Sequence, residues 1–190
     1  MSNKPAPVDP RKDSPPPADG LRIAISGKSG CGNSTVSRLV AARLGLSVIN
    51  YTFKNLAHDK GMSFDEICVL AETDPQYDLT LDKMQVQLAS KGACVLGSRL
   101  AIWLLRDIAF TVYLKAPLLV RAQRIARREG KEEPAALRET DERDRRDHDR
   151  YSRLYGYDVD RYDFAALVVD AASLSQEEVT EKIVASARRP

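Results

Sequence analysis

The sequence predicts an α/β fold, a three-layer α/β/α domain built on about five parallel strands. Short apolar segments alternate with amphipathic helical segments from residue 21 onward, the pattern of a parallel sheet covered by helices on both faces. The first apolar segment runs directly into a glycine-rich turn and then into a helix. The chain has 190 residues, which is enough for one domain with a well-filled core.

The elements follow one another in a regular order. The predicted strands are short apolar runs at residues 21–26, 47–49, 93–96, 110–114 and 165–169. The predicted helices lie between the strands, over about 34–44, 53–60, 63–73, 79–90 and, as a long charged helical region, 117–154. A last helix is expected from about Ser175, because Glu177 and Glu178 in its first turn favour a helix N-terminus.

The first 20 residues differ from the rest of the chain. They contain six prolines and almost no large apolar side chain. Such a segment cannot bury enough surface to offset its ordering entropy, so residues 1–20 are expected to form a disordered tail. The tail is either a solvated extension or a proline-rich docking segment. The domain is expected to span residues 21–190.

Composition excludes several function classes. The formal net charge of +2 is too small to argue for a nucleic-acid partner. The three cysteines have no CxxC or Cys/His spacing, so a disulfide framework or zinc site is not expected. The apolar runs are far shorter than the roughly 18 residues of a membrane span, and no secretory signal precedes the domain. We expect a cytoplasmic monomer that binds neither membrane nor nucleic acid.

The turn after the first strand predicts a phosphate-binding loop, or P-loop. A strand before it and a helix after it are the context that such a loop requires. Closely spaced glycines let backbone N–H groups wrap phosphate oxygens, and the helix N-terminus adds partial positive charge. The residues expected to bind nucleotide are Gly27, Lys28, Ser29, Gly30, Cys31, Gly32, Asn33, Ser34 and Thr35. Ser34 falls where a hydroxyl would ligand Mg²⁺, so the fold expected is that of a P-loop NTPase.

One position departs from the usual G-x-x-x-x-G-K-[ST] pattern. Asn33 occupies the lysine position, and its amide carries no charge to neutralise a β- or γ-phosphate. Losing a transition-state donor costs on the order of 10²–10³ in rate. Either Lys28 replaces the missing lysine from the other side of the loop, or Lys28 is a solvated loop charge and the site is catalytically weak.

An arginine-rich segment follows the fourth strand. Residues 121–153 contain ten arginines, and phosphoryl transfer needs cations that close over the transferring group. We therefore expect a helical lid over about 127–153, with Arg127, Arg143 and Arg146 as catalytic phosphate contacts. The alternative is that the interleaved charges only solvate the helices through i,i+4 pairs.

Four further stretches resemble a known family. They are Tyr51–Ala57 with Gly61–Glu66, Ala71–Gln85, Val95–Trp103, and Glu139–Asp163 with its Arg150-Tyr151 and Tyr155-Gly156-Tyr157-Asp158 steps. Together with the phosphate loop they resemble the short, archaeal-type cytidylate kinases of the nucleoside monophosphate kinase superfamily. The resemblance covers residues 21–184.

The resemblance implies phosphoryl transfer from ATP, with Mg²⁺, to CMP or dCMP, and an acceptor-binding region over about 50–92. It implies that Arg99 and Lys54 hold the acceptor phosphate and that Asp82 helps to read the cytosine or ribose. Lys54 stands where the family has arginine, so a bidentate contact becomes a point-charge contact. Gly97 and Ser98 stand where the family has glutamate and glycine, so a carboxylate is missing.

Two other functions stay open from the sequence. The missing lysine and the missing glutamate favour a nucleotide sensor that binds nucleotide with little or no turnover. A kinase of another small nucleotide or metabolite would keep the chemistry and change the acceptor. Nucleotide titration separates binding from turnover, and a panel of acceptors separates the two kinases.

Overall fold

The sheet is the centre of the molecule and has five parallel strands. The computed structural model describes residues 7–12 and 20–188, and its strands are β1 (Arg22–Ser26), β2 (Ser47–Ile49), β3 (Cys94–Gly97), β4 (Phe110–Lys115) and β5 (Leu167–Asp170). They pair in the order β2-β3-β1-β4-β5, which places β1 and its following loop at the middle of the sheet. The predicted α/β fold with about five parallel strands is confirmed.

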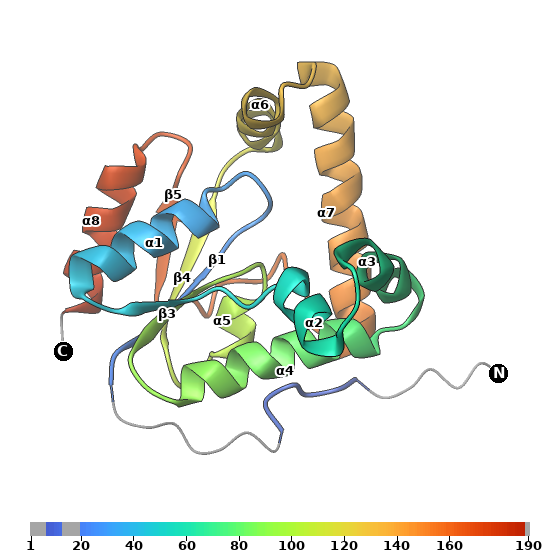
Figure 1. Cartoon of the computed structure of the whole chain (residues 1–190). Helices are drawn as coiled ribbons and strands as arrows, with labels where there is room; N and C mark the ends of the chain where they lie inside the picture. Colours follow the sequence, from blue (N-terminus) through green and yellow to red (C-terminus); the bar gives the residue numbers. More distant parts are fainter. Residues whose placement is uncertain (1–6, 13–19, 189–190) are drawn as a thin grey trace.

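Helices cover both faces of this sheet (Figure 1). On one face α1 (Asn33–Leu44) and α8 (Gln176–Ala187) pack together over a core that includes Ile23 and Val112. On the other face α4 (Gln76–Ser90) and α5 (Ala101–Leu104) bury a second core around Leu96. Strand residues alternate between the two cores, so all five residues of β1 are buried, as expected for a central parallel strand.

Two short helices stand beside the sheet between β2 and α4. They are α2 (Phe53–Lys60) and α3 (Phe64–Thr73), separated by Gly61, which adopts a left-handed φ of 65°. The N-cap of α3 is Ser63, whose side chain accepts from the Glu66 N–H, while Glu66 accepts from the Ser63 N–H. Their small core consists of Leu56, Ala57 and Ile67.

The charged region divides into two helices that form an arm. These are α6 (Leu118–Glu129) and α7 (Glu133–Tyr155), and the arm rises above the carboxyl edge of the sheet (Figure 1). Gly130 and Gly156 end the two helices with φ values of 65° and 68°, the left-handed conformation typical of a helix C-cap. Only the last turns of α7, around Tyr151 and Tyr155, enter the core beneath the sheet.

Residues 7–12 lie against the foot of the arm. The Val8 N–H donates to the carbonyl of Leu154 at 2.9 Å, and Arg11 pairs with Asp107 at 2.6 Å. The rest of the predicted disordered tail, residues 1–6 and 13–19, lies outside the described residues. Within the part of the chain that is described, no helix is both long and apolar enough to cross a bilayer.

Candidate active site

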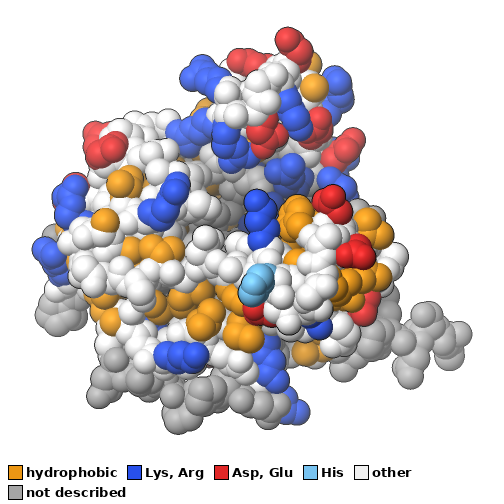
Figure 2. Space-filling view, viewed as in Figure 1, with side chains coloured by type: hydrophobic (Ala, Val, Ile, Leu, Met, Phe, Trp, Pro, Cys, Tyr) orange, Lys and Arg blue, Asp and Glu red, His pale blue; other side chains and the backbone are white. Residues whose placement is uncertain are grey.

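A cleft opens where the phosphate loop, the end of β3, the arm and the β5–α8 connection meet. It encloses about 720 Å³ and is lined by Gly97 and Ser98, by residues 28–36 and by Ala171 and Gln176 from the far wall. Six basic residues line it, and among the described residues no acidic side chain does. The six are Lys28, Arg99, Arg124, Arg127, Arg128 and Arg143. In Figure 2 basic side chains gather around the hollow between the arm and α1.

The phosphate loop has the backbone shape that its glycines predict. Gly30 and Gly32 have φ values of 87° and 99°, which side-chain-bearing residues rarely adopt. A Cβ at Gly30 would also lie 2.8 Å from the carbonyl oxygen of Arg121, so the loop packs directly on α6. Gly32 is the N-cap of α1, and the helix N-terminus therefore opens into the cleft beside Ser34 and Thr35.

Asn33 is turned into the loop itself. Its Nδ2 donates to the Gly27 carbonyl at 2.6 Å. Its Oδ1 is buried without a hydrogen-bond partner among the described residues. The side chain therefore closes the turn from inside, and it contributes no charge to the cleft.

Lys28 is held by a carboxylate from another part of the chain. Its Nζ lies 2.6 Å from Oδ1 of Asp160, in the segment between α7 and β5. Both side chains are partly exposed, at 32% for Lys28 and 52% for Asp160. Lys28 is the single ionisable side chain of the loop from 27 to 35 apart from Cys31, whose pKa is raised by burial. The Cys31 thiol is therefore a buried, unreactive filler.

Arg99 lies where the end of β3 meets the arm. Its guanidinium donates to Oγ of Ser29 at 3.0 Å and pairs with Asp147 of α7 at 2.9 Å. Asp147 also accepts from Arg150 at 3.3 Å, and Arg150 lies 3.5 Å from Asp78 of α4. Burial raises the pKa of Asp147 although Arg99 and Arg150 act in the opposite direction. These pairs fasten the foot of the arm to the domain.

A buried arginine, Arg121, fastens the phosphate loop to both helices of the arm. Arg121 of α6 is 4% exposed and donates to Asp144 of α7 at 2.6 and 3.2 Å. It also donates to the Ser29 and Ala116 carbonyls, each at 3.1 Å. Neither Arg121 nor Asp144 stands out in the sequence, because nothing in a local pattern distinguishes a buried arginine from the nine others of this segment.

The structure brings together part of the predicted site. The phosphate loop, Arg99, Arg127 and Arg143 all line the cleft. Lys54 is exposed on α2, with its Nζ 5.7 Å from the centre of the Phe64 ring, and Arg146 is exposed on α7; neither lines the cleft. Asp82 is buried, and its carboxylate accepts a hydrogen bond from Tyr155. The roles assigned to these residues stay predictions.

Two cleft residues were missed from the sequence. Arg124 and Arg128 lie one turn apart on α6, and Arg124 donates to the Ala171 carbonyl at 2.6 Å. Their i,i+4 spacing on the face that continues from Arg121 is a signal that could have identified them. No sequence signal marks the β5–α8 connection, which reaches the cleft only because β5 lies at the sheet edge beyond β4.

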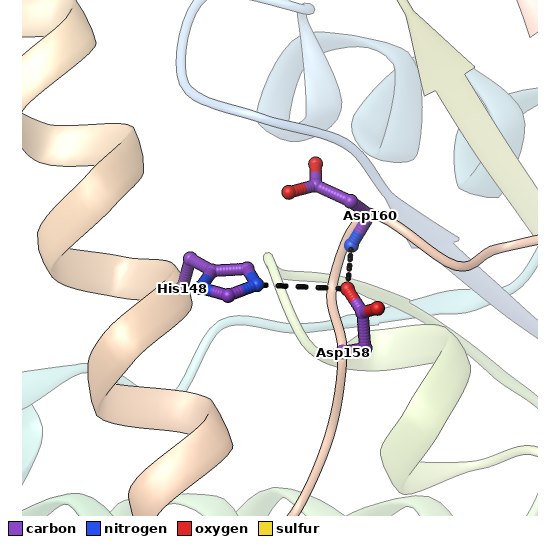
Figure 3. Close-up of side chains that lie close together, drawn as sticks. All are labelled: His148, Asp158 and Asp160. Atoms are coloured by element: carbon purple, nitrogen blue, oxygen red, sulfur yellow. Dashed lines mark hydrogen bonds and ion pairs between the residues drawn. The ribbon is translucent and has the colours of Figure 1, made fainter.

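A small polar cluster links α7 to the segment that follows it (Figure 3). His148 Nε2 lies 3.7 Å from Asp158 Oδ1, and the same oxygen accepts from the Asp160 N–H at 3.0 Å. The ligand atoms of these three residues lie within 4.8 Å of one another. The Asp160 carboxylate is already engaged by Lys28, so the cluster acts as a link between arm and loop.

Fold and site together define the class of protein. A parallel sheet in this order, with a phosphate loop after β1 and an arginine-bearing helical arm, is the architecture of P-loop kinases. Solved structures with this fold include the shikimate kinase of Bacteroides thetaiotaomicron (14% identity, 86% of this chain and 95% of that chain, TM-score 0.56). They also include a gluconokinase of Sinorhizobium meliloti 1021 (17% identity, 88% and 91%, TM-score 0.55).

Sequence comparison identifies the family. The chain belongs to the cytidylate kinase-like family, whose model matches residues 22–173. It is 42% identical over 168 residues to a cytidylate kinase of Aeropyrum pernix, covering 87% of this chain and 98% of the relative. It is 41% identical over 167 residues to cytidylate kinase 2 of Borrelia garinii subsp. bavariensis, covering 86% and 94%. The resemblance found in the sequence is confirmed.

Proposed function

We propose that this protein is a cytidylate kinase that transfers the γ-phosphoryl group of ATP to CMP or dCMP. The observation that carries the proposal is the cleft, which combines a phosphate loop with six basic and no acidic lining residues among those described. Phosphoryl transfer depends on positioning and on neutralising charge, and this lining supplies both. The choice of cytidylate as acceptor comes from the family and from its relatives.

The residues divide between donor and acceptor. The loop amides and the N-terminus of α1 would hold the β- and γ-phosphates of ATP, with Lys28 as the cation that replaces the missing lysine. Arg127 and Arg143 would cover the transferring group from the arm. Arg99 lies deeper, between the loop and Asp147, and would hold the acceptor phosphate. Lys54 and Asp82 would complete the acceptor site after the arm and the α2–α3 region close.

The cleft offers a side-chain ligand for Mg²⁺, the hydroxyl of Ser34. Ser34 is exposed in the first turn of α1 and lines the cleft. Because no carboxylate lines the cleft among the described residues, the ion would be held chiefly by the nucleotide phosphates, with Ser34 as its protein ligand. Bound there, Mg²⁺ would neutralise charge that develops on the phosphate oxygens. Closure of the arm would exclude water from the phosphoryl group.

An ADP-release assay tests this function. The protein is given ATP and Mg²⁺ with CMP, dCMP, UMP or AMP in turn, and CMP- or dCMP-dependent turnover above about 1 s⁻¹ is expected. A preference for another acceptor would support the kinase chemistry and refute the choice of cytidylate as the acceptor.

One observation favours a second candidate, a nucleotide sensor with little turnover. Asn33 is engaged inside the loop, so the position that usually supplies a phosphate-binding lysine supplies no cation. Tight binding of ATP or CMP in a titration, with no turnover on any acceptor, would establish the sensor and refute the kinase.

Lys28→Ala tests the replacement of the missing lysine. The expected result is a fall in kcat of about 10²-fold, the effect of removing one transition-state donor. Full activity in this variant would show that Lys28 is a solvated loop charge.

A further inference from the structure

The positive charge of the phosphate loop comes from Lys28 at its start, because the usual lysine position is occupied by Asn33. Asn33 is folded inward, and Gly97, on the opposite wall, leaves no room for a side chain, since a Cβ there would overlap Ser37 Oγ and lie 2.8 Å from Ser37 Cβ. Neither position 33 nor position 97 can therefore present an ionised group to the loop, and the nearest cation from the β3 side is Arg99, which donates to Ser29 Oγ at 3.0 Å. Lys28 is therefore the loop's own cation, and what holds its flexible side chain decides where that charge is delivered.

Lys28 lies at a boundary between two hollows. It lines the large cleft and also a small pocket of about 20 Å³ lined by Trp103, Tyr113 and Asp147. Arg99 is the other basic residue that lines both. In the proposed kinase, a cation at this boundary would lie between the donor phosphates on the loop and the acceptor phosphate on Arg99.

Asp160 approaches Lys28 from a turn that is fixed in place. Its N–H donates to Asp158 Oδ1 at 3.0 Å, and the Arg161 N–H donates to the Asp158 carbonyl at 3.2 Å. The next residue, Tyr162, stacks on Tyr113 of β4 with ring centres 3.7 Å apart. The carboxylate is therefore attached to the rigid sheet, while the ammonium it holds is at the end of four rotatable bonds.

We propose that Asp160 is a positioning residue that holds the Lys28 ammonium at the boundary between the donor and acceptor phosphates. An ammonium has three donors, so the bond to Asp160 leaves two for phosphate oxygens. The pair is partly exposed, and such pairs contribute little to folding stability, so its effect is expected in the reaction. This inference rests on the proposed kinase function and on Lys28 as its phosphate cation.

The test is a kinetic cycle of Lys28→Ala, Asp160→Asn and the double variant, with Asp160→Glu as the conservative change. Asp160→Asn is expected to lower kcat by about 10- to 100-fold, the scale of a misplaced catalytic group, with both KM values within about twofold of the wild type. Asp160→Glu should recover part of the loss. The double variant should be no slower than Lys28→Ala, because Asp160 acts only through Lys28.

The matched control is Asp163→Asn, an exposed carboxylate in the same segment that lines neither hollow. Its kcat should equal that of the wild type, and melting curves should show all the variants folded. Unchanged kcat in Asp160→Asn, or additive losses in the double variant, would overturn the role of Asp160 and leave the kinase proposal standing. A wild-type protein that turns over no acceptor would refute the kinase and the role of Asp160 together.

Discussion

The arginines of the cleft and the arginines at the foot of the arm have different surroundings. At the foot, Arg121 pairs with Asp144 and Arg150 with Asp78, while Arg99 belongs to both regions, since it lines the cleft and pairs with Asp147. In the cleft, no ion pair among the described residues involves Arg127 or Arg143, and Arg128 pairs only with its neighbour Glu129. The same residue type thus builds the joint of the arm in one region and leaves open charge in the other.

Paired and unpaired arginines are expected to contribute to different properties, the first to stability and the second to ligand binding. A buried pair fixes geometry because breaking it strands a charge in a dry environment. A cation with no partner in an open cleft costs self-repulsion with its neighbours and gains from any polyanion that enters. Substitutions at the foot should therefore lower stability first, and substitutions in the cleft should lower activity first.

The largest effect is expected from Arg121→Ala. It leaves Asp144 unpaired and removes the donor to the Ser29 and Ala116 carbonyls, so the free energy of unfolding should fall by about 3–5 kcal/mol. Urea unfolding measures it. Arg145→Ala is the control, since Arg145 forms an exposed i,i+4 pair with Asp141 that is worth at most about 0.5 kcal/mol. Equal losses of unfolding free energy in Arg121→Ala and Arg145→Ala would show that the buried pair at the foot adds no more stability than an exposed pair.

Arg143→Ala should show the reverse pattern. If Arg143 covers the phosphates as proposed, its removal is expected to lower kcat by about 10²-fold, while the melting temperature stays within about 1–2 °C of the wild type. Arg145→Ala, on the same helix and outside the cleft, serves again as the control for activity. A much lower melting temperature with an unchanged kcat would show that Arg143 stabilises the fold and does not act in the reaction.

The smallest effect is expected from Asp82→Asn, and it depends on pH. Burial raises the pKa of Asp82 to about 7, although the hydrogen bond from Tyr155 lowers it. In the unfolded chain this carboxyl ionises near its ordinary 3.8, so between pH 4 and 7 the folded protein binds the extra proton and stability falls as pH rises. Asparagine cannot ionise, so the variant should lose less stability across this window.

The measurement is urea unfolding of the wild type and Asp82→Asn at pH 4.5, 6 and 7.5. The difference in unfolding free energy between the two proteins should grow across the series by more than about 1 kcal/mol in favour of the variant. Asp163→Asn should follow the wild type at each pH. Parallel curves for the wild type and Asp82→Asn would show that the Asp82 carboxyl ionises normally.

Most of the fold could be predicted from the sequence because its signals are local. Apolar runs located all five strands within three residues, and the glycine loop located the cleft. The four-residue helix α5 is not among the predicted elements, since it is too short to show a helical period. The start of α4 at Gln76 is three residues earlier than predicted, because Pro75 is well suited to a helix N-terminus.

The part of the site that could be predicted from the sequence is the part that depends on local signals, namely the glycine loop and some of the arginines. Arg127 and Arg143 were chosen among ten arginines and line the cleft, whereas Arg146, one turn further along α7, points elsewhere. Asp82 is enclosed by Tyr155, 73 residues away in the chain, and the partner of Lys28 is Asp160. Such pairings depend on how α7 and the segment after it return to the sheet, which single-sequence periodicity does not contain.

The close contact between Gly97 and Ser37 constrains which side chains position 97 can accept. A glutamate introduced at position 97 would collide with both Oγ and Cβ of Ser37, so it requires α1 or β3 to shift. Asn33 has its own carbonyl 3.3 Å from the same point, so the two departures from the family pattern are neighbours across one interface. A substitution at position 97 therefore acts on the same contact as one at position 33, and the effects of the two are expected not to be additive.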